Sequence, residues 1–490
     1  MQRSMQRSIH APERPQLPHV LVVGGGIAGL AAAARLSGAD AGAAGAGAPT
    51  ARVTLVEAGP RLGGKLHASE LDGIPVDLGA ESMLARRPEA VQLARAVGLG
   101  EALQPPTTAR AAIWTRGALR PMPGGQLMGV PSDLDALAAS GVLSAEGLAR
   151  IAEEPALPAT EVGTDVAVGG YLAERLGREV VDRLVEPLLG GVYAGNADRI
   201  SMRAAVPQLL AVAQRGGSLI AGVRELLAAA PANPGPVFTG IDGGIGRLPL
   251  AVADACRAAG VELLTDAPAG ALRRTPDGWS CVVGGRRLDA DAVVLAVPAP
   301  VAAELLAEQA PGAAAELATV EYAGMALITL AFHRADLGEP SGSGFLVPPV
   351  DGRLIKASTF SSNKWGWLAA AAPDSFVLRT SVGRYGDQQD LDRDDADLVA
   401  GSLDDLRAAA GITARPYAST VTRWRGGLPQ YPVGHLDRVE RIERLVAELP
   451  GLVLCGAAYH GVGIPACVAG AWRAVDLVRE ALGAEGRMNA

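Results

Sequence analysis

The sequence has few cysteines, few aromatic residues and no excess of positive charge. Its four cysteines, Cys256, Cys281, Cys455 and Cys467, show neither the CxxC spacing nor the histidine neighbours of a metal site. We therefore predict no metal and no disulfide framework, and the cysteines fit a reducing cytosol. Lys and Arg number 44 against 52 Asp and Glu, and the resulting net charge of -8 argues against nucleic acid as a partner.

Long apolar runs are also absent. No stretch reaches the roughly 18 consecutive apolar residues of a membrane-spanning helix. Residues 1–18, MQRSMQRSIHAPERPQLP, lack the apolar core of a secretory signal and predict a disordered tail. We expect a cytoplasmic protein, while apolar helices around residues 209–230 leave association with the inner face of a membrane open.

A strand, a glycine-rich turn and a helix open the ordered chain. The run His19–Val23 ends in GGGIAG, and an Ala-rich helix follows. Gly24 permits the turn, Gly26 lets the backbone approach a pyrophosphate, and Gly29 brings helix and strand together. The helix N-terminus offers N–H groups and positive charge to the phosphates. The expected contacts are Gly24, Gly25, Gly26, Ile27, Ala28 and Gly29.

An acidic residue ends the next strand, residues 52–57. Glu57 can accept hydrogen bonds from ribose hydroxyls and disfavours a 2'-phosphate. It lies further from Gly29 than the usual spacing of about 20 residues. We attribute the excess to residues 37–51, SGADAGAAGAGAPTA, an expanded surface loop. A glycine turn without ligand is the alternative, and the strand, helix and acid together argue against it.

The segment after Glu57, AGPRLGGKLHASELDGIPVDLGAESM, resembles the signature of the amine oxidase, phytoene desaturase and porphyrinogen oxidase superfamily, whose members bind FAD. The resemblance implies a second phosphate loop and a strand that passes the flavin. Near the C-terminus, GLVLCGAAYHGVGIPACVAGAW has the form of a strand, a glycine-rich bend and a helix, with Pro465 suited to the first turn of that helix. The N-terminus of that helix would stabilise negative charge on the reduced flavin. The further FAD contacts that the resemblance implies are Glu57, Ala58, Arg61, Gly64, Lys65, Gly79, Ala80, Glu81, Ser82, Trp424, Val462, Gly463 and Ile464.

Within this superfamily, LVEPLLGGVYAGNADRISMRAA is similar to a segment of the HemY-type porphyrinogen oxidases, as are IDGGIGRLP, KASTFSSNKWGW and RWRGGLPQYPVGH. The chain departs from that pattern in its Gly/Ala-rich loop and at DAPAG near Pro268, where the family places a Val beside the adenine. The resemblance implies an α/β fold with a Rossmann-like, monoamine-oxidase-like FAD-binding domain and an interleaved α+β substrate domain. The expected divisions are 19–105, 216–300 and 426–485 for FAD, a helical substrate- or membrane-proximal insertion at 106–215, and a substrate-binding sheet at 301–425.

The resemblance also implies the reaction. Hydride would pass from a meso methylene to flavin N5, a pyrrole nitrogen would lose a proton, and dioxygen would reoxidise the flavin with release of hydrogen peroxide. Three rounds make a six-electron oxidation within heme biosynthesis. One dinucleotide fingerprint predicts one FAD per chain, bound noncovalently, and no separate NAD(P)H site. Coproporphyrinogen III is the favoured substrate. Protoporphyrinogen IX, an amine, and a non-catalytic FAD-binding protein are alternatives, and handover of product to a ferrochelatase stays open.

A porphyrinogen is apolar and carries carboxylates, so we expect an apolar slot with cations at its rim. The substrate candidates are Arg86, Arg87 and Lys356, with Arg203 and Lys364 as further places to look. The alternative for Arg86 and Arg87 is a solvated pair before a helix that begins at Pro88.

No catalytic side chain is predicted with certainty, because the flavin carries the chemistry. Tyr193, Tyr459 and His460 are polar groups in matched motifs, but a lone histidine is more often structural. Cys455 and Cys467 flank the C-terminal bend, and we interpret both as small buried apolar residues without a redox role.

Overall fold

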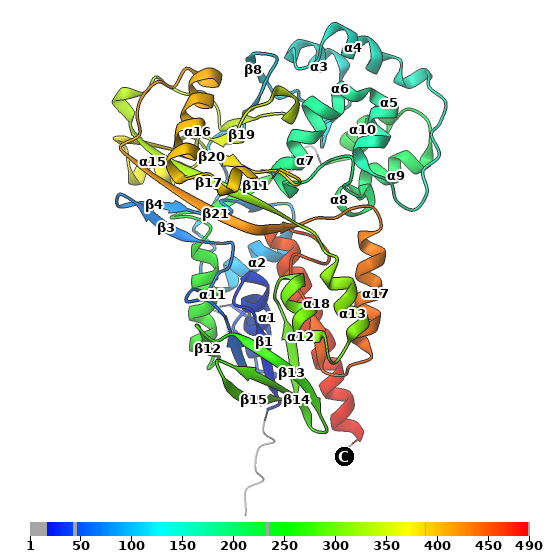
Figure 1. Ribbon diagram of the computed structural model, residues 1–490, viewed down its shortest axis with the longest axis vertical. Helices are drawn as coiled ribbons and strands as arrows, with labels where there is room; N and C mark the ends of the chain where they lie inside the picture. The colour runs from blue at the N-terminus through cyan, green and yellow to red at the C-terminus, as the bar shows by residue number, and fades with distance from the viewer. Residues whose placement is uncertain (1–16, 43–46, 232–234, 388, 489–490) are drawn as a thin grey trace, which may run out of the picture.

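The computed structural model describes residues 17–42, 47–231, 235–387 and 389–488. Most of the expected N-terminal tail, residues 1–16, lies outside the described residues. In Figure 1 a nucleotide-binding unit forms the lower half of the molecule, and a second sheet and a helical unit lie side by side above it. None of the described helices is long and apolar enough to cross a membrane.

The lower unit is built on a parallel sheet with both faces covered. Its strands follow the order β12 (Glu262–Leu264), β2 (Arg52–Val56), β1 (His19–Val23), β16 (Ala292–Leu295) and β22 (Leu452–Leu454). β1 is buried along its whole length, as expected for a strand with helices on one face and further structure on the other. The predicted α/β fold is confirmed.

Helices cover one face of this sheet, and a small sheet with three helices covers the other. The first layer comprises α1 (Ile27–Ser37), α2 (Pro88–Ala96), α11 (Arg247–Ala258) and α18 (Ile464–Met488). The second comprises β13 (Ala269–Thr275), β14 (Gly278–Val283), β15 (Arg286–Ala290), α12 (Ala299–Leu306), α13 (Pro311–Ala318) and α17 (His435–Ala447). Segments more than 400 residues apart in sequence, such as α1 and α18, thus share one apolar core.

The upper sheet has seven strands and two unlike faces. Its order is β21 (Ala418–Pro429), β17 (Tyr322–His333), β20 (Ser375–Val382), β19 (Ile355–Thr359), β18 (Gly344–Leu346), β7 (Ala111–Thr115) and β8 (Ala118–Pro121). One face buries apolar side chains such as Phe332 and Leu378 beneath α16 (Asp395–Ala410). The other faces α14 (Ser361–Lys364), α15 (Gly366–Ala371) and the hairpin of β3 (Ala68–Leu71) and β4 (Ile74–Asp77).

The expected helical insertion at residues 106–215 does not begin with a helix. β7 pairs in parallel with β18 and antiparallel with β8, so residues 111–121 extend the upper sheet. The physical reason is burial on both faces of β7: Trp114 packs in the core of the upper sheet, and Ile113, at 0% exposure, packs in the core of the helical unit. β21 likewise runs through the expected boundary at residue 425 without interruption.

The expected boundary at residue 301 also differs from the structure. α12 and α13 pack with Val293 and Leu295 of the lower sheet, in the same core as Leu306 and Leu317. Apolar side chains on these helices therefore assign residues 299–318 to the nucleotide-binding unit. Short strands complete the fold: β5 (Met83–Leu84), β6 (Leu103–Gln104), β9 (Gln126–Leu127), β10 (Val130–Pro131) and β11 (Phe238–Ile241).

The helical unit follows β10 and continues to residue 228. It contains α3 (Leu134–Ser140), α4 (Ala145–Ala152), α5 (Val168–Leu176), α6 (Arg178–Val180), α7 (Glu186–Tyr193), α8 (Met202–Ala205), α9 (Pro207–Arg215) and α10 (Leu219–Ala228). A π-helical turn at Val181–Val185 joins α6 to α7. Pro187 lies two residues after Val185, and because proline lacks an N–H the preceding turn cannot keep regular α-helical bonding.

A buried ion pair ties this unit together. Glu154 is 0% exposed and lies 2.5 Å from Arg175, and it also accepts from the Ser218 hydroxyl at 2.6 Å and from Leu219 N at 2.7 Å. Glu154 thereby connects the segment after α4 with α5 and the start of α10. Buried charges survive only when they are paired in this way.

We predict that Glu154→Gln destabilises the protein by about 3 kcal/mol, because it leaves the buried Arg175 without its counter-charge. The neighbouring Glu153 provides a matched control. It pairs with Arg150 at 3.9 Å on the surface, so Glu153→Gln should cost less than about 1 kcal/mol. Urea unfolding followed by circular dichroism measures both. Equal costs for the two variants would contradict the assignment.

Candidate functional site

The first glycine turn has the geometry that a dinucleotide requires. Gly24 adopts φ +109°, and a Cβ there would lie 2.5 Å from the Ala296 carbonyl oxygen. A Cβ on Gly29 would lie 1.9 Å from the Gly24 oxygen, so only glycine allows helix and turn to approach so closely. Gly26 faces open space and caps α1 without a side-chain hydrogen bond, which leaves helical N–H groups free for phosphate oxygens. These residues fit a pyrophosphate.

The Glu57 carboxylate holds this turn in place. Its two carboxylate oxygens accept from Gly25 N at 2.8 Å and from Gly59 N at 2.9 Å. Each oxygen keeps a second lone pair, so a ribose hydroxyl can still bind. The unusual DAPAG segment runs beside this loop, where Ala267 N donates to the Glu57 carbonyl at 2.9 Å.

The second loop lies directly against the first. Gly63 N donates to Gly25 O at 2.8 Å. Arg61 donates to Gly64 O at 2.7 Å and to Leu62 O at 3.1 Å, so much of its guanidinium fixes the shape of the loop. Lys65 is exposed, yet surrounding protein desolvates its ammonium and lowers its pKa, as expected for a side chain in a hollow.

The strand that was expected to pass the flavin ends in close contact with the second loop. A Cβ on Gly79 would lie 1.9 Å from the Lys65 carbonyl oxygen. Asp77 is buried and accepts from Ile245 N and Gly246 N at 2.9 Å each, at the start of α11. Burial raises the pKa of Asp77 to about 6, although these two bonds oppose the rise. The matched segment IDGGIGRLP therefore meets the matched strand in space.

Two cations of the upper sheet unit bind the end of this strand. Arg379 of β20 donates to the carbonyl oxygens of Asp77 at 2.8 Å and Gly79 at 2.9 Å, and its guanidinium lies 3.1 Å from Glu81. Lys364 lies 2.6 Å from the other Glu81 oxygen. Burial alone would raise the pKa of Glu81, but these two cations lower it to about 2, so Glu81 is ionised.

Trp424 of β21 completes this contact. Its indole N–H donates to Leu78 O at 2.8 Å, and its ring meets that of His67 edge to face. The predicted cofactor residues Gly79, Glu81 and Trp424 therefore lie together where the two units meet. The sequence did not reveal Arg379. The available signal was a single arginine within the apolar strand SFVLRTSV.

The C-terminal bend has the predicted form of strand, glycine-rich bend and helix. β22 ends at Leu454, and α18 begins at Ile464 with Pro465 in its first turn. Burial raises the pKa of the Cys455 thiol to about 12 and of Cys467 to about 11, so both stay protonated. All four cysteines are buried and reduced, in agreement with the apolar reading. His460 lies 2.6 Å from Glu443 on the surface, a structural pairing.

The structure does not bring the substrate candidates together. Arg86 and Arg87 are exposed, and Arg87 lies 2.8 Å from Glu89 at the start of α2, as the solvated-pair alternative expects. Lys356 is buried, and that burial together with Arg384 lowers its pKa to about 7, so it is not a rim cation. Arg203 pairs with Asp437 at 2.6 Å and Glu440 at 3.2 Å.

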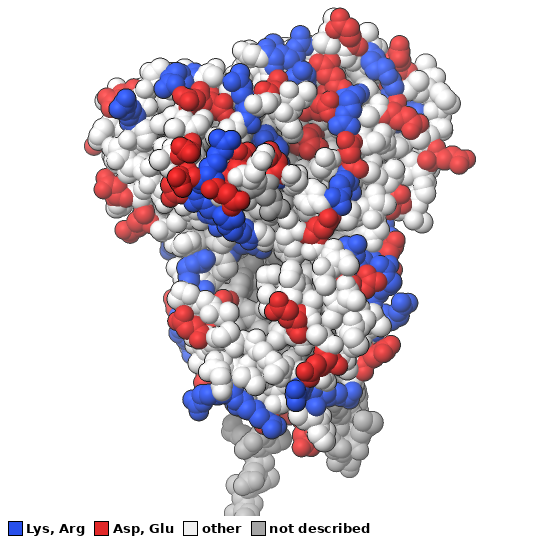
Figure 2. Space-filling view, in the orientation of Figure 1, with Lys and Arg blue, Asp and Glu red and all other residues white. Residues whose placement is uncertain are grey.

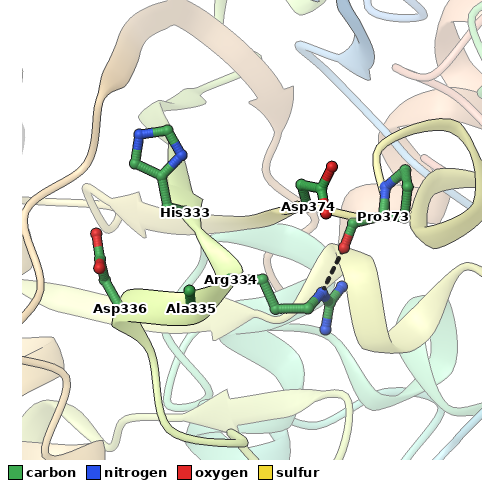
Figure 3. Close-up of a pocket in the computed structure, with 6 residues that line it drawn as sticks. All are labelled: His333, Arg334, Ala335, Asp336, Pro373 and Asp374. Carbon is green, nitrogen blue, oxygen red and sulfur yellow. Dashed lines mark hydrogen bonds between the residues drawn. The ribbon is translucent and has the colours of Figure 1, made fainter.

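Charge and surface hollows do not indicate another site. Figure 2 shows acidic and basic side chains interspersed over one face of the molecule. Many of these charges pair with each other: Arg425 lies 2.8 Å from Asp392, and Arg393 lies 2.7 Å from Asp390. A hollow at the outer end of β17, shown in Figure 3, is lined by His333, Arg334, Ala335, Asp336, Pro373 and Asp374. It is open, and Arg334 donates across it to Pro373 O at 3.0 Å. An apolar substrate requires a more enclosed slot.

We predict that Glu57→Ala weakens dinucleotide binding by about 1.5 to 3 kcal/mol for each charged hydrogen bond lost, and that turnover of fully loaded enzyme changes little. The loss combines the ribose contact with loosening of the Gly25 and Gly59 turn. Glu70→Ala, an exposed acid on β3, is the control and should leave binding unchanged. Equilibrium binding of FAD to the apoprotein measures both, and an unchanged dissociation constant in Glu57→Ala would contradict the assignment.

Comparison with known proteins agrees with this geometry. The chain is 38% identical to the coproporphyrinogen III oxidase of Mycobacterium leprae, over 94% of this chain and 97% of that protein. It is 27% identical to the chloroplastic protoporphyrinogen oxidase 1 of Spinacia oleracea, over 92% of this chain and 82% of that protein. A crystal structure from an Exiguobacterium species, provisionally named a protoporphyrinogen oxidase, superposes with TM-score 0.82 at 34% identity, over 94% of this chain and 99% of that chain.

A family model matches residues 27–479 under the description flavin containing amine oxidoreductase. This match confirms the predicted superfamily, the predicted FAD cofactor and the assignment as a flavin-dependent oxidoreductase. The Arg61–Lys65 loop and the bend before α18 lie within the matched residues, which begin at Ile27, just after Gly24, Gly25 and Gly26. The chain therefore belongs to the flavin containing amine oxidoreductase family.

Proposed function

We propose that this protein oxidises coproporphyrinogen III to coproporphyrin III, with FAD as cofactor and dioxygen as electron acceptor. The observation that carries the proposal is the full-length likeness to the coproporphyrinogen III oxidase of Mycobacterium leprae. The lower identity to the spinach protoporphyrinogen oxidase supports coproporphyrinogen over protoporphyrinogen IX, the second candidate. An amine substrate would need aromatic walls beside the flavin, and Tyr459 at the bend is only 3% exposed.

Bound FAD would accept hydride from the substrate and pass electrons to dioxygen. The residues of the two glycine loops, with Glu57, would hold its pyrophosphate and ribose. The N-terminus of α18 would direct its positive end toward the ring through Val462, Gly463 and Ile464. Glu81 is ionised and paired with both Arg379 and Lys364, so it orders the site and does not take a proton.

Arg86 and Arg87 remain the proposed contacts for substrate carboxylates. They follow β5, four to six residues beyond Ser82 and Glu81, and their exposure suits a pocket rim. Beside them lie two exposed apolar side chains, Leu84 at 41% and Phe238 at 43%, which oppose each other across β5 and β11. We propose that this edge contacts a membrane peripherally, and that a ferrochelatase receives the product at the same face. The exposed apolar side chains support these proposals.

The proposal is tested by mixing the purified holoenzyme with coproporphyrinogen III, protoporphyrinogen IX or a primary amine in air. We expect porphyrin fluorescence to grow well above the spontaneous rate, faster with coproporphyrinogen, with hydrogen peroxide as co-product. A preference for protoporphyrinogen IX would select the second candidate. Oxidation of the amine without oxidation of either porphyrinogen would overturn both.

We predict that Arg86→Ala or Arg87→Ala raises KM for coproporphyrinogen by up to about fivefold, the value for an exposed charge pair. Coproporphyrinogen carries four carboxylates and protoporphyrinogen two, so the effect should be smaller for the latter. The reaction of reduced flavin with oxygen should not change. Arg407→Ala on the outer helix α16 is the control. Negligible effects on both substrates, at confirmed FAD occupancy, would return both arginines to a solvated surface role.

A further inference from the structure

Tyr431 holds the bend that leads into α18. Its hydroxyl donates to the Ala457 carbonyl oxygen at 2.5 Å and accepts from Gly461 N at 2.9 Å. Both partners belong to the segment between β22 and α18. The side chain is 1% exposed, so these two bonds are shielded from water. The Tyr431 hydroxyl therefore links Ala457 to Gly461, which are four positions apart in the bend.

The ring of Tyr431 is itself anchored to the helical unit. It stacks on His435 with centroids 3.9 Å apart and planes 12° apart, and it packs against Tyr193 at 5.7 Å. Its backbone carbonyl accepts from Ser201 N at 2.8 Å. Burial lowers the pKa of His435 to about 4, so the ring is neutral, and its Nε2 donates to Tyr459 O at 3.2 Å.

The bend is rich in glycine, so its own backbone does not fix its conformation. Contacts from outside the segment, such as those of Tyr431, must hold it. Gly456 and Gly461 adopt φ +124° and +137°, and a third glycine, Gly463, immediately precedes α18. Cys467 N donates to Gly463 O at 3.0 Å, which begins the helix. Without contacts from the rest of the protein, these glycines would allow the N-terminus of α18 to change its position relative to a bound cofactor.

We propose that Tyr431 is a positioning residue that fixes the N-terminus of α18 against the flavin and thereby raises the reduction potential of bound FAD. The inference rests on the proposed function and on the proposed contact of Val462, Gly463 and Ile464 with the ring. Reduced flavin carries more negative charge than oxidised flavin, and the positive end of a helix stabilises that charge only when its distance is held constant. Tyr431 acts through the bend and does not touch the substrate.

The test compares Tyr431→Phe with Tyr459→Phe in the holoenzyme. The first variant keeps the stacked ring and removes one hydroxyl with two partners. The second removes a buried hydroxyl that has no hydrogen-bond partner among the described residues. The potential of bound FAD is measured by anaerobic equilibration with a redox dye. We expect Tyr431→Phe to lower the reduction potential of bound FAD by about 30 mV, which for two electrons is a tenfold shift toward oxidised FAD. Tyr459→Phe should have the same potential as the wild type.

Hydrogen exchange of the FAD-free protein supplies a second measurement. Amides in residues 456–467 should exchange faster in Tyr431→Phe than in Tyr459→Phe, because only the first loses the bond to Gly461 N. Faster exchange with an unchanged potential would overturn the inference and leave Tyr431 a purely structural residue. An equal shift in both variants would also overturn it. Failure of the wild type to bind FAD would instead refute the proposed function, and this inference with it.

Discussion

The guanidinium of Arg379 is the interaction on which the site depends. It projects from the upper sheet, binds two backbone carbonyls at the end of β4, and shares Glu81 with Lys364. Carbonyl oxygens cannot move without moving the chain, so the path from Asp77 to Glu81 is fixed relative to the sheet. Removing one member of such a buried network leaves an uncompensated charge, a cost of about 3 to 5 kcal/mol. The two units therefore keep one relative arrangement.

The fixed path from Asp77 to Glu81 also holds the two glycine loops in place. Gly79 lies against the Lys65 carbonyl, and Gly63 of the same loop donates to Gly25 in the first turn. A continuous set of backbone contacts thus connects the upper sheet, through the two glycine loops, to the N-terminus of α1. On the opposite side, Tyr431 connects the helical unit to the bend before α18.

The sequence predicted local features well and long-range features poorly. Gly24 and Gly29 could be assigned because their roles depend on neighbouring turns, and Pro465 because proline suits a first helical turn. The roles of Arg379 and Tyr431 could not be assigned, because their partners are distant in the sequence. Arg379 binds Asp77, 302 residues away, and Tyr431 binds Ala457, 26 residues away. The segment 106–215 was misjudged for a related reason: a strand such as β7 gains its place only from β18, more than 200 residues later. The roles of Arg86 and Arg87 stay predictions, whereas the burial of Lys356 could not be foreseen from the sequence.

The most direct test of the account is anaerobic mixing of the oxidised holoenzyme with one equivalent of coproporphyrinogen III in a stopped-flow spectrometer. Without oxygen, electrons that leave the substrate remain on the flavin. The account predicts rapid loss of the yellow flavin absorbance with coproporphyrinogen, and its return only when oxygen is admitted. Flavin that stays oxidised with coproporphyrinogen but is bleached by a primary amine would contradict it.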